Sequence, residues 1–368
     1  MTLEEFLEEW NNDSEQVMVH TSGSTGKPKP MWVEKRRMEA SARITCDFLG
    51  LKEGDTALLC MSLDYIAGKM MVVRSLVRKL KLIVVEPTGH PLAHPKTPLQ
   101  LPRGGEFCSG ACPPPRGSWR GVFAAMVPMQ VYNSLQVPQE RERLKQIKHL
   151  IIGGGAIDEA MASELKDFPN YVWSTYGMTE TLSHIALRRL NGPEASEWYK
   201  PFPSVEISQN DEGCLVIDAP QVCSERLVTN DIVEISEAGF RIIGRKDNVI
   251  CSGGIKIQAE EVERILKPYV RVPFLITKHK DQKFGEIVVM MVEDRGKATG
   301  RRAELGNERK EEREERESLK TRLQSLCREH LPKYWQPRDF VFVEKLPMTE
   351  TGKPARKQAE ELATQNFS

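Results

Sequence analysis

The sequence predicts an α/β fold, with a large N-terminal domain built on a mainly parallel sheet plus a small β subdomain, and a smaller α+β C-terminal domain. Between residue 17 and about residue 190, short apolar runs alternate with longer amphipathic segments, as in sheets whose strands are joined by helices. From about 202 to 243, short strands and turns replace this alternation. A compact mixture of strands and helices follows, and 368 residues are enough for two domains.

Each predicted element rests on its apolar pattern. In the large domain we expect strands at 17–19, 57–60, 82–85, 149–152 and 171–173, and helices at 34–49, 66–79, 122–136 and 157–166. The β subdomain should contain strands 205–207 and 214–217, and the C-terminal part a helix at 258–267, strands near 272–277, 286–292 and 339–343, and a long charged helix. The polar break at 244–247 places the domains at 1–246 and 247–368.

Segment 95–120 differs from the rest of the chain. It is rich in proline, glycine and arginine and has no apolar period, so we expect a disordered insert that forms no packed element.

Composition excludes some classes of function. The formal net charge is +0, so no overall field attracts nucleic acid or a membrane, and no apolar run is long enough to span a bilayer. The amphipathic start of the chain, where Thr2 and Glu5 form a capping box, is unlike a signal peptide. The eight cysteines are scattered, which favours free thiols in a reducing cytoplasm. We predict a cytoplasmic protein with a small-molecule substrate and no nucleic-acid or membrane partner, and leave its oligomeric state open.

The segment 20–29 is the first candidate site. It follows the predicted strand 17–19 and precedes the predicted helix 34–49, and its glycines, hydroxyls and lysines can direct donors at an anion such as a polyphosphate. The residues concerned are Thr21, Ser22, Gly23, Ser24, Thr25, Gly26 and Lys27. Thr21 and Pro28 depart from the phosphate loop G-x-x-x-x-G-K-[ST]. A plain connection of the same composition is the alternative.

Two further polar motifs follow predicted strands. Gly154 lies in the run 153–156, and the run Tyr176, Gly177, Met178, Thr179, Glu180 ends in a carboxylate that could hold Mg²⁺ beside a triphosphate. An ordinary helix cap would explain the second motif equally well.

Three motifs nearer the C-terminus complete the candidates. Asp231 could accept both hydroxyls of a ribose, although Asn-Asp pairs are also common in turns. Gly253 and Gly254 form a glycine-rich turn that could equally be a hairpin loop. Lys353 stands on a loop framed by Gly352 and Pro354, where a surface lysine without a role is the simpler alternative.

Taken together and in order, these segments resemble the adenylate-forming enzymes: acyl-CoA synthetases, luciferases and peptide-synthetase adenylation domains. The matching segments are T-S-G-S-T-G-K-P-K, G-G-G-A, Y-G-M-T-E, N-D-I-V-E with G-F-R-I-I-G-R-K-D, S-G-G-I-K-I and L-P-M-T-E-T-G-K. Within this group the chain is most similar to short-form o-succinylbenzoate–CoA ligases of menaquinone biosynthesis, on the segments 63–69 and 176–187.

The resemblance implies a two-step reaction. A carboxylate attacks the α-phosphate of ATP, giving an acyl-adenylate and pyrophosphate, and the thiol of coenzyme A then displaces AMP. By motif, the 21–27 loop would hold the β- and γ-phosphates, Thr179 would contact phosphate, Glu180 would bind Mg²⁺, and Asp231 and Arg245 would hold the ribose. Asp247 would be the hinge on which the small domain rotates, Gly253 and Gly254 would line the path of coenzyme A, and Lys353 would bridge the carboxylate and the α-phosphate.

Two residues are predicted in the acyl pocket. Tyr65 stands where many members of the group have histidine, and would flank the aromatic ring of the substrate. Arg74 interrupts an apolar helix, and a buried arginine needs an anionic partner. That partner could be an internal carboxylate, or the ring carboxylate that o-succinylbenzoate keeps after activation.

Other functions remain open from the sequence alone. The chain could ligate another aromatic or aliphatic acid, transfer the acyl group to a carrier protein, or be a nucleotide-binding relative with impaired catalysis. Many members of the group carry a longer segment ahead of the phosphate loop, so part of the large domain is expected to be absent or dispensable.

Overall fold

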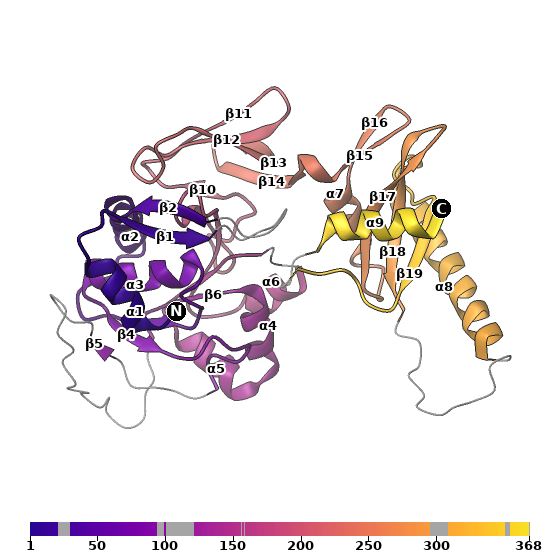
Figure 1. Ribbon diagram of the computed structural model, residues 1–368. Helices are drawn as coiled ribbons and strands as arrows, with labels where there is room; N and C mark the ends of the chain where they lie inside the picture. The colour runs from indigo at the N-terminus through magenta and orange to yellow at the C-terminus, as the bar shows by residue number, and fades with distance from the viewer. Residues whose placement is uncertain are drawn as a thin grey trace. The chain divides into compact units, whose positions relative to one another are not determined.

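The computed structural model describes residues 1–20, 30–93, 99–100, 121–155, 157, 159–294, 308–349 and 354–367 (Figure 1). The chain forms two compact units. The first comprises Met1–Ser208, Val216–Val228 and Ile235–Arg241, and the second comprises Gln209–Leu215, Thr229–Glu234 and Ile242–Ser368. Because both units include strands of the predicted β subdomain, the predicted domain boundary at residue 246 stays a prediction.

The first unit is built on an eight-stranded sheet in the order β10-β9-β8-β7-β6-β3-β4-β5. Its strands are β3 (Thr56–Leu59), β4 (Lys81–Val84), β5 (Leu99–Gln100), β6 (Phe123–Met126), β7 (His149–Ile152), β8 (Tyr171–Gly177), β9 (His184–Arg189) and β10 (Lys200–Pro201). The central pairs β4–β3, β3–β6, β6–β7 and β7–β8 are parallel, and the outer pairs are antiparallel. The predicted mainly parallel α/β sheet is therefore confirmed.

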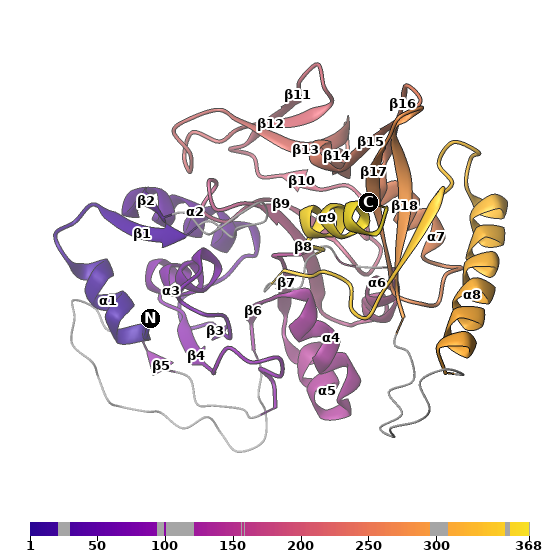
Figure 2. The same ribbon diagram turned by 45° about the vertical axis from the view of Figure 1, so that its right-hand side comes forward.

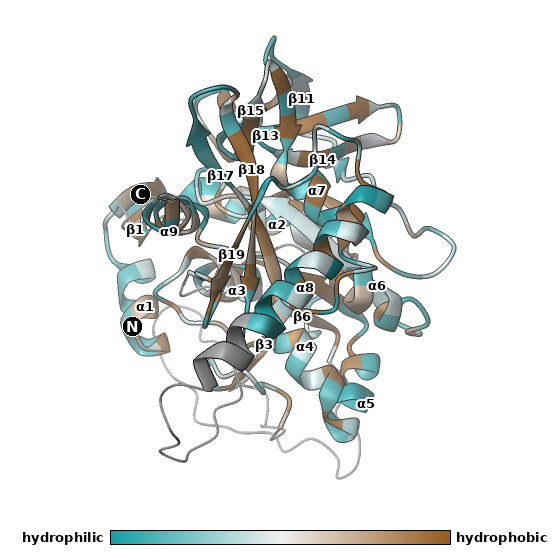
Figure 3. Cartoon of the chain, turned by 90° about the vertical axis from the view of Figure 1, so that its right-hand side faces the viewer, coloured by the Kyte–Doolittle hydropathy of each residue, from teal (hydrophilic) through white to brown (hydrophobic). Residues whose placement is uncertain are grey.

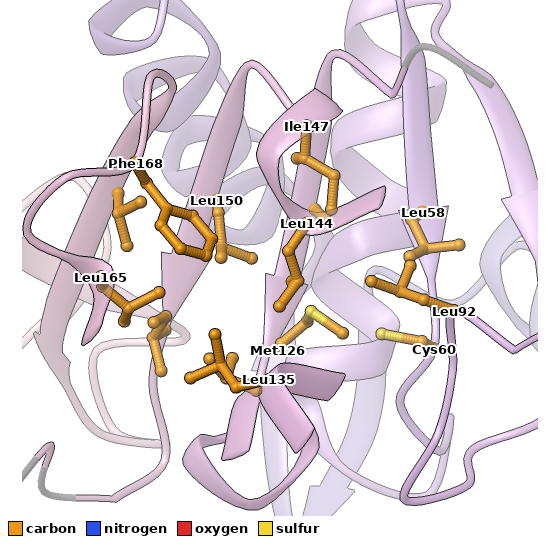
Figure 4. Packing of buried hydrophobic residues seen from close by; sticks show 14 of the residues in the cluster. Leu58, Cys60, Leu92, Met126, Leu135, Leu144, Ile147, Leu150, Leu165 and Phe168 are labelled. Carbon is orange, nitrogen blue, oxygen red and sulfur yellow. The ribbon is translucent and has the colours of Figure 1, made fainter. Parts of the chain in front are cut away.

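Helices pack on this sheet through apolar side chains. The helices α4 (Pro128–Gln136), α5 (Pro138–Gln146) and α6 (Glu159–Leu165) supply Leu135, Leu144 and Leu165 to a buried cluster that also contains Leu58, Met126 and Leu150 from the strands (Figure 4). Helix α3 (Ile66–Arg78) contacts β3 and β4, and α2 (Lys35–Phe48) packs against α3 (Figure 2). Burial of this apolar surface provides most of the free energy that holds the helices on the sheet.

The first part of the predicted helix 122–136 is wrong. Residues Phe123–Met126 form strand β6 at the centre of the sheet, and α4 begins only at Pro128. All four residues of β6 are buried, so the run is apolar throughout and carries no strand-like alternation. A continuous apolar run fits a buried strand or a buried helix, whereas Pro128 at the first helical position marks the true start.

The sequence predicts that segment 20–29 leads from a strand to a helix. In the structure, the element that follows this segment is a second strand. The strand β1 (Gln16–His20) pairs antiparallel with β2 (Pro30–Glu34), which was not predicted, and α2 then begins at Lys35. In β2 only Val33 is buried, while Trp32 is 62% exposed, so the strand lacks an apolar pattern. The segment 21–29 between these strands, which contains the predicted phosphate-binding residues, lies outside the described residues.

The expectation that segment 95–120 forms no element is wrong at two residues. Leu99 and Gln100 form β5, which adds an antiparallel strand to β4 at the edge of the sheet. Its register pairs Lys81 with Gln100 and Leu82 with Leu99. Two residues are too short to show a period, so composition could not predict this pairing; the remainder of the segment lies outside the described residues.

The β subdomain predicted after residue 202 is a four-stranded sheet in the order β11-β12-β13-β14. Its strands are β11 (Glu206–Gln209), β12 (Cys214–Asp218), β13 (Leu227–Ser236) and β14 (Gly239–Arg245). A short 3₁₀ helix, Lys246–Asn248, follows β14 and contains the predicted hinge residue Asp247. The predicted polar break at 244–247 is thus partly strand, because Gly244 and Arg245 end β14.

The second unit contains a five-stranded sheet covered by helices on both faces. Strands β15 (Val249–Ser252), β16 (Ile255–Gln258), β17 (Phe274–Asp281), β18 (Gly285–Glu293) and β19 (Asp339–Val343) form the sheet. Ile276 and Val288 pack on one face with α7 (Ala259–Leu266) and α8 (Glu308–His330). Leu275 and Val289 pack on the other with α9 (Arg356–Phe367). Figure 3, coloured by hydropathy, shows that β18 consists mainly of hydrophobic residues and that the described part of α8 is largely hydrophilic. The predicted α+β arrangement is confirmed.

Three further features of the described residues bear on the predictions from the sequence. In the parts that the structure describes, no helix combines the length and the apolar character needed to cross a membrane. The six cysteines of the described ranges are free thiols. The N-terminal helix α1 (Leu3–Asn11) begins with the predicted capping box between Thr2 and Glu5.

The environment of His149, at the start of β7, predicts that the folded protein loses stability in acid. The ring of His149 stacks on Tyr171, with 5.0 Å between centroids, and within the described parts of the chain neither ring nitrogen has a hydrogen-bond partner. Burial, with Lys148 and Arg189 nearby, lowers the pKa of His149 from 6.5 to about 4. Between these two values the unfolded chain binds a proton that the folded chain does not, so the free energy of unfolding should fall as the pH falls from 6.5 to 4.

The variant His149→Phe keeps the stacked ring and removes the titrating group. Urea unfolding at pH 7 and pH 5 should show a smaller loss of stability on acidification in this variant than in the wild type. Equal losses in both proteins would contradict the assignment to His149.

Candidate functional site

The candidate site of the first unit lies where strands of the parallel sheet end. The loops after β3, β7 and β8 leave at their carboxyl ends, the edge at which α/β sheets bind ligands. The loop after β7 contains Gly153 and Gly154, and Gly154 has a positive φ of +77°. A Cβ on Gly153 would lie 2.3 Å from Oγ1 of Thr175, so this backbone runs directly against β8. Glycine is therefore required for the close approach of the two neighbouring strands.

Tyr176 and Gly177 were expected in the turn after a strand ending near residue 173, and this is wrong. Both belong to β8, which extends to residue 177. The ring of Tyr176 is buried, with its centroid 5.0 Å from that of Phe240 and 5.9 Å from that of Tyr199. A Cβ on Gly177 would lie 2.1 Å from the carbonyl oxygen of Ser183, so this glycine permits the irregular pairing of β8 with β9. The nucleotide contacts expected of both residues stay predictions.

The turn after β8 presents one hydroxyl and one carboxylate. Thr179 is 4% exposed and its carbonyl accepts the N–H of Leu182 at 2.9 Å, whereas the side chain of Glu180 is exposed. Thr181 braces the turn, since its hydroxyl donates to the carbonyl of Ser183 at 2.8 Å. The turn thus fixes the backbone and leaves Glu180 free to meet a ligand from solvent.

The second unit brings together the residues predicted to hold a ribose. Nη1 of Arg245 lies 3.0 Å from Oδ1 of Asp231, and Nη2 lies 2.9 Å from Oδ2 of Asp247. Asn230 donates to the carboxylate of Asp247 at 3.2 Å. One guanidinium therefore links the predicted ribose carboxylate on β13 to the predicted hinge residue.

Gly253 and Gly254 form the two-residue turn between β15 and β16, with φ of +58° and +83°. Positive φ at both positions is the signature of a type I′ hairpin, which favours glycine. The hairpin alternative is thus confirmed as structure. No atom of the described residues lies within 4 Å of a Cβ built on Gly254. Its role with coenzyme A stays a prediction.

Arg74 is the most unusual charged residue of the first unit. It is 2% exposed in α3, and no carboxylate among the described residues forms an ion pair with it, so the internal salt bridge weighed as one alternative is not found in this part of the chain. Its Nη2 donates to Oγ of Ser183 at 2.6 Å and its Nη1 lies 3.9 Å from Sδ of Met71, while its Nε has no hydrogen-bond partner among the residues that the structure describes. Burial lowers the pKa of Arg74 to about 10, so it stays charged at neutral pH.

Sequence reasoning missed Ser183, which holds Arg74, and its neighbour His184. A serine and a histidine directly after the motif 176–180 were the available signal, but their pairing with a helix more than a hundred residues earlier is a tertiary contact. Tyr65, the other predicted acyl-pocket residue, precedes α3 as its N-cap and is 41% exposed.

The 21–27 loop and Lys353 lie outside the described residues. The chain on both sides of Lys353 is described: Met348 pairs with Pro354, and the N–H of Ala355 donates to the carbonyl of Pro347 at 2.9 Å. Arg356 directly follows Ala355, and its guanidinium binds both carboxylate oxygens of Glu263, at 3.0 and 2.7 Å. The ends of this segment are thus fixed to the second unit.

Curated relatives resemble the chain over nearly its whole length. It is 24% identical over 383 residues to the 2-succinylbenzoate–CoA ligase of Listeria monocytogenes serovar 1/2a, covering 97% of this chain and 72% of the relative. It is 25% identical over 394 residues to the 2-succinylbenzoate–CoA ligase of a Geobacillus species, covering 98% and 72%.

Solved structures and family models also match this chain over most of its length. An acyl-CoA synthetase (AMP-forming)/AMP-acid ligase II-like protein from Dyadobacter fermentans is 32% identical, with a TM-score of 0.58 and coverage of 99% of this chain and 93% of that one. An o-succinylbenzoate CoA synthetase from Bacillus subtilis shares the fold, with 21% identity, a TM-score of 0.67 and coverage of 93% and 68%. Residues 4–220 match the AMP-binding enzyme family and residues 279–353 match the AMP-binding enzyme C-terminal domain. The chain therefore belongs to the family of AMP-binding enzymes.

Proposed function

We propose that this enzyme is an ATP-dependent carboxylate–CoA ligase that converts o-succinylbenzoate to o-succinylbenzoyl-CoA through an acyl-adenylate. The name shared by its curated relatives supports this substrate. The observation that carries the proposal is Arg74, a buried charged guanidinium whose Nε is unpaired and which forms no ion pair within the described ranges.

A buried cation of this kind is costly unless an anion completes it. The edge of the guanidinium formed by Nε and Nη2 can donate two parallel hydrogen bonds to one carboxylate, since Nη2 carries two hydrogens and Ser183 accepts only one of them. The substrate o-succinylbenzoate has two carboxylates, and the one on the ring remains charged after the other is activated. We infer that Arg74 binds the ring carboxylate and that Tyr65 flanks the ring.

The first step joins the succinyl carboxylate to the α-phosphate of ATP. In the proposed mechanism the 21–27 loop holds the β- and γ-phosphates, Gly154, Tyr176 and Gly177 line the nucleotide site, and Thr179 contacts phosphate. Asp231 accepts hydrogen bonds from the ribose hydroxyls, and Arg245 keeps that carboxylate oriented at 3.0 Å. Lys353 places its charge between two anions that must approach each other.

The residues present suit Mg²⁺ held largely by the phosphates of ATP. The described residues contain no cluster of three or more metal-ligating side chains, and Glu180 offers a single exposed carboxylate. Mg²⁺ is commonly bound by one or two carboxylates together with substrate phosphates and water. Glu180 would therefore hold the ion, whose charge offsets that of the phosphates.

The second step uses coenzyme A, whose thiol attacks the acyl carbonyl and releases AMP. We infer that the C-terminal part rotates about Asp247 between the steps, which removes Lys353 from the site and brings Gly253 and Gly254 to the coenzyme A path. The scattered free thiols and the small-molecule substrates support a cytoplasmic location.

An assay of ATP-dependent AMP release with a panel of aromatic and aliphatic acids, with and without coenzyme A, tests this function. We expect o-succinylbenzoate to give the highest kcat/KM and AMP release to require coenzyme A. A preference for an acid with one carboxylate would overturn the substrate, and consumption of the adenylate by a carrier protein but not by coenzyme A would overturn the acceptor.

A variant of the proposed hinge should separate the two steps. Asp247→Pro fixes φ and removes an N–H, so the backbone can no longer absorb the rotation. We expect one half-reaction to survive and the other to fail, when adenylate formation and thioester formation are measured separately. Asp247→Ala is the matched control, because it removes the same contacts to Arg245 and Asn230 but leaves φ free. Full overall turnover in Asp247→Pro would rule out a hinge at this residue.

A further inference from the structure

Behind Arg74, side chains from three elements form a continuous chain of hydrogen bonds. Nη2 of Arg74 in α3 donates to Oγ of Ser183 at 2.6 Å, and that oxygen lies 3.1 Å from Nδ1 of His184 at the start of β9. On the other side of the ring, Nε2 lies 3.1 Å from Oγ1 of Thr45 in α2. The hydroxyl of Thr45 donates in turn to the carbonyl of Ser41, one helical turn earlier, at 3.1 Å.

The hydrogen bond from Thr45 to Ser41 determines which atoms donate and which accept in the other hydrogen bonds. Because the one hydroxyl proton of Thr45 goes to the carbonyl of Ser41, its oxygen accepts from Nε2–H of His184. The neutral ring then has its acceptor at Nδ1, which takes the hydroxyl proton of Ser183. The oxygen of Ser183 is left to accept from Nη2 of Arg74, so each link between Thr45 and Nη2 of Arg74 has one donor and one acceptor.

If the donors and acceptors were reversed, the hydroxyl proton of Ser183 would have no acceptor within this chain of hydrogen bonds. If Thr45 donated to the ring, Nδ1–H of the ring would donate to Ser183, whose oxygen already accepts from Arg74, and the hydroxyl proton of Ser183 would lose the ring as its acceptor. The carbonyl of Ser41, inside α2, would keep only its helical N–H partner. Thr45 is fully buried and His184 is 7% exposed, and a polar group left unsatisfied in such a place destabilises the protein. Complete pairing therefore favours the order that ends on Arg74.

The ring of His184 is suited to this role because it stays neutral. Burial lowers the pKa of His184 well below its usual range, and the charge of Arg74 lowers it further. A protonated ring would donate from both nitrogens and would repel the guanidinium. Phe202 packs against the ring, with 5.7 Å between centroids, and restricts its rotation.

We propose that Ser183, His184 and Thr45 are positioning residues for Arg74, and that this chain of hydrogen bonds sets how tightly the enzyme holds the free carboxylate of its acid substrate. The inference rests on the proposed function, in which Arg74 binds that carboxylate. Ser183 holds one Nη2 hydrogen and thereby fixes the plane of the guanidinium, so that the unpaired Nε faces the ligand in a defined orientation.

The variant Thr45→Val tests the far end of the chain, where no contact with substrate is proposed. It keeps the shape of the side chain and removes the hydroxyl. The KM for o-succinylbenzoate should rise about three- to tenfold, the range for one neutral hydrogen bond, with kcat little changed. The KM for 3-benzoylpropionate, which lacks the ring carboxylate, should stay as in the wild type, and Thr45→Ser should restore the wild-type ratio of the two KM values.

Ser75→Ala is the matched control. Ser75 is buried in α3 beside Arg74, and its hydroxyl donates to the carbonyl of Met71 at 2.9 Å, one turn earlier, as that of Thr45 does in α2. It takes no part in the chain of hydrogen bonds, so the ratio of KM values should not change. Ser183→Ala provides a second variant should Thr45→Val fail to fold, and it should raise the KM for the diacid at least as much.

A double-mutant cycle identifies the residue through which Thr45 acts. In the Arg74→Ala background, Thr45→Val should cause no further selective change. If Thr45→Val affects both substrates equally, or keeps its effect without Arg74, the positioning role is overturned while the proposed function stands. If Arg74→Ala itself shows no preference between the substrates, the proposed function is overturned and this inference with it.

Nitrogen chemical shifts of the histidine rings give a readout independent of activity. In the wild type His184 should show a protonated Nε2 and an unprotonated Nδ1, with the signal assigned by its loss in His184→Gln. Thr45→Val should shift the Nε2 signal and Thr45→Ser should not. A wild-type ring protonated at Nδ1 would contradict the proposed order of donors.

Discussion

Lys353→Ala should slow formation of the acyl-adenylate about a hundredfold or more, as expected when one preorganised charge donor is lost from a transition state. In the proposed mechanism this lysine lies between the attacking carboxylate and the α-phosphate, two anions that repel each other. Thioester formation from preformed acyl-adenylate should be nearly unchanged, because the C-terminal part has by then carried the lysine away.

Single-turnover measurements of the two half-reactions check this prediction. Lys345→Ala, a lysine earlier in the same C-terminal segment with no proposed role, is the control and should leave both steps unchanged. An equal loss in both half-reactions would show that Lys353 supports binding or folding instead. The described residues on either side of this segment are held in place, since Met348 pairs with Pro354 and Arg356 binds both carboxylate oxygens of Glu263.

The sequence predicted the fold well where each element carries its own pattern. Strand 149–152 was predicted at its observed bounds, and α3 within one residue. In the C-terminal part, α7 is strongly amphipathic and the alternation along β17 and β18 directs side chains to two different helical layers. These are local patterns, and local patterns are what a single sequence records.

The errors in the predicted secondary structure occur in segments whose structure is determined by tertiary contacts. Strand β2 has one buried residue and exists because β1 pairs with it, and β5 exists because its two residues complete the edge of β4. Strand β6 is buried on both faces, so its apolar run also fitted a helix. In each case the pattern within the segment does not determine its structure.

In the candidate site as well, local motifs were predictable and contacts between distant segments were not. The motifs placed Thr179 and Glu180 correctly in the turn after β8, although Tyr176 and Gly177 belong to the strand itself. The two residues predicted to hold the ribose, Asp231 and Arg245, are in contact. A buried Arg74 was predicted from its apolar neighbours, yet its contact with Ser183 was not, since 109 residues separate the two in the chain. Thr45 and His184 carried still less signal, because a threonine or histidine within an apolar segment is usually a satisfied core residue.

Arg74→Ala should raise the KM for o-succinylbenzoate about tenfold to a hundredfold. The variant removes up to two charge-assisted hydrogen bonds to the ring carboxylate, and hydrogen bonds to charged groups contribute about 1.5–3 kcal/mol. The effect on 3-benzoylpropionate should be far smaller, because that acid offers nothing for the guanidinium to bind. Arg74→Lys should recover only part of the affinity, since an ammonium cannot present two parallel donors.

Stability measurements separate this role from a structural one. A guanidinium at 2% exposure with an unpaired Nε costs free energy in the unliganded protein, so Arg74→Ala should lower the melting temperature little or raise it. An arginine that served the fold would behave in the opposite way: its loss would destabilise the protein and weaken both substrates equally. That outcome would remove the main physical support for a diacid substrate, because Arg74 is the residue proposed to bind the free carboxylate.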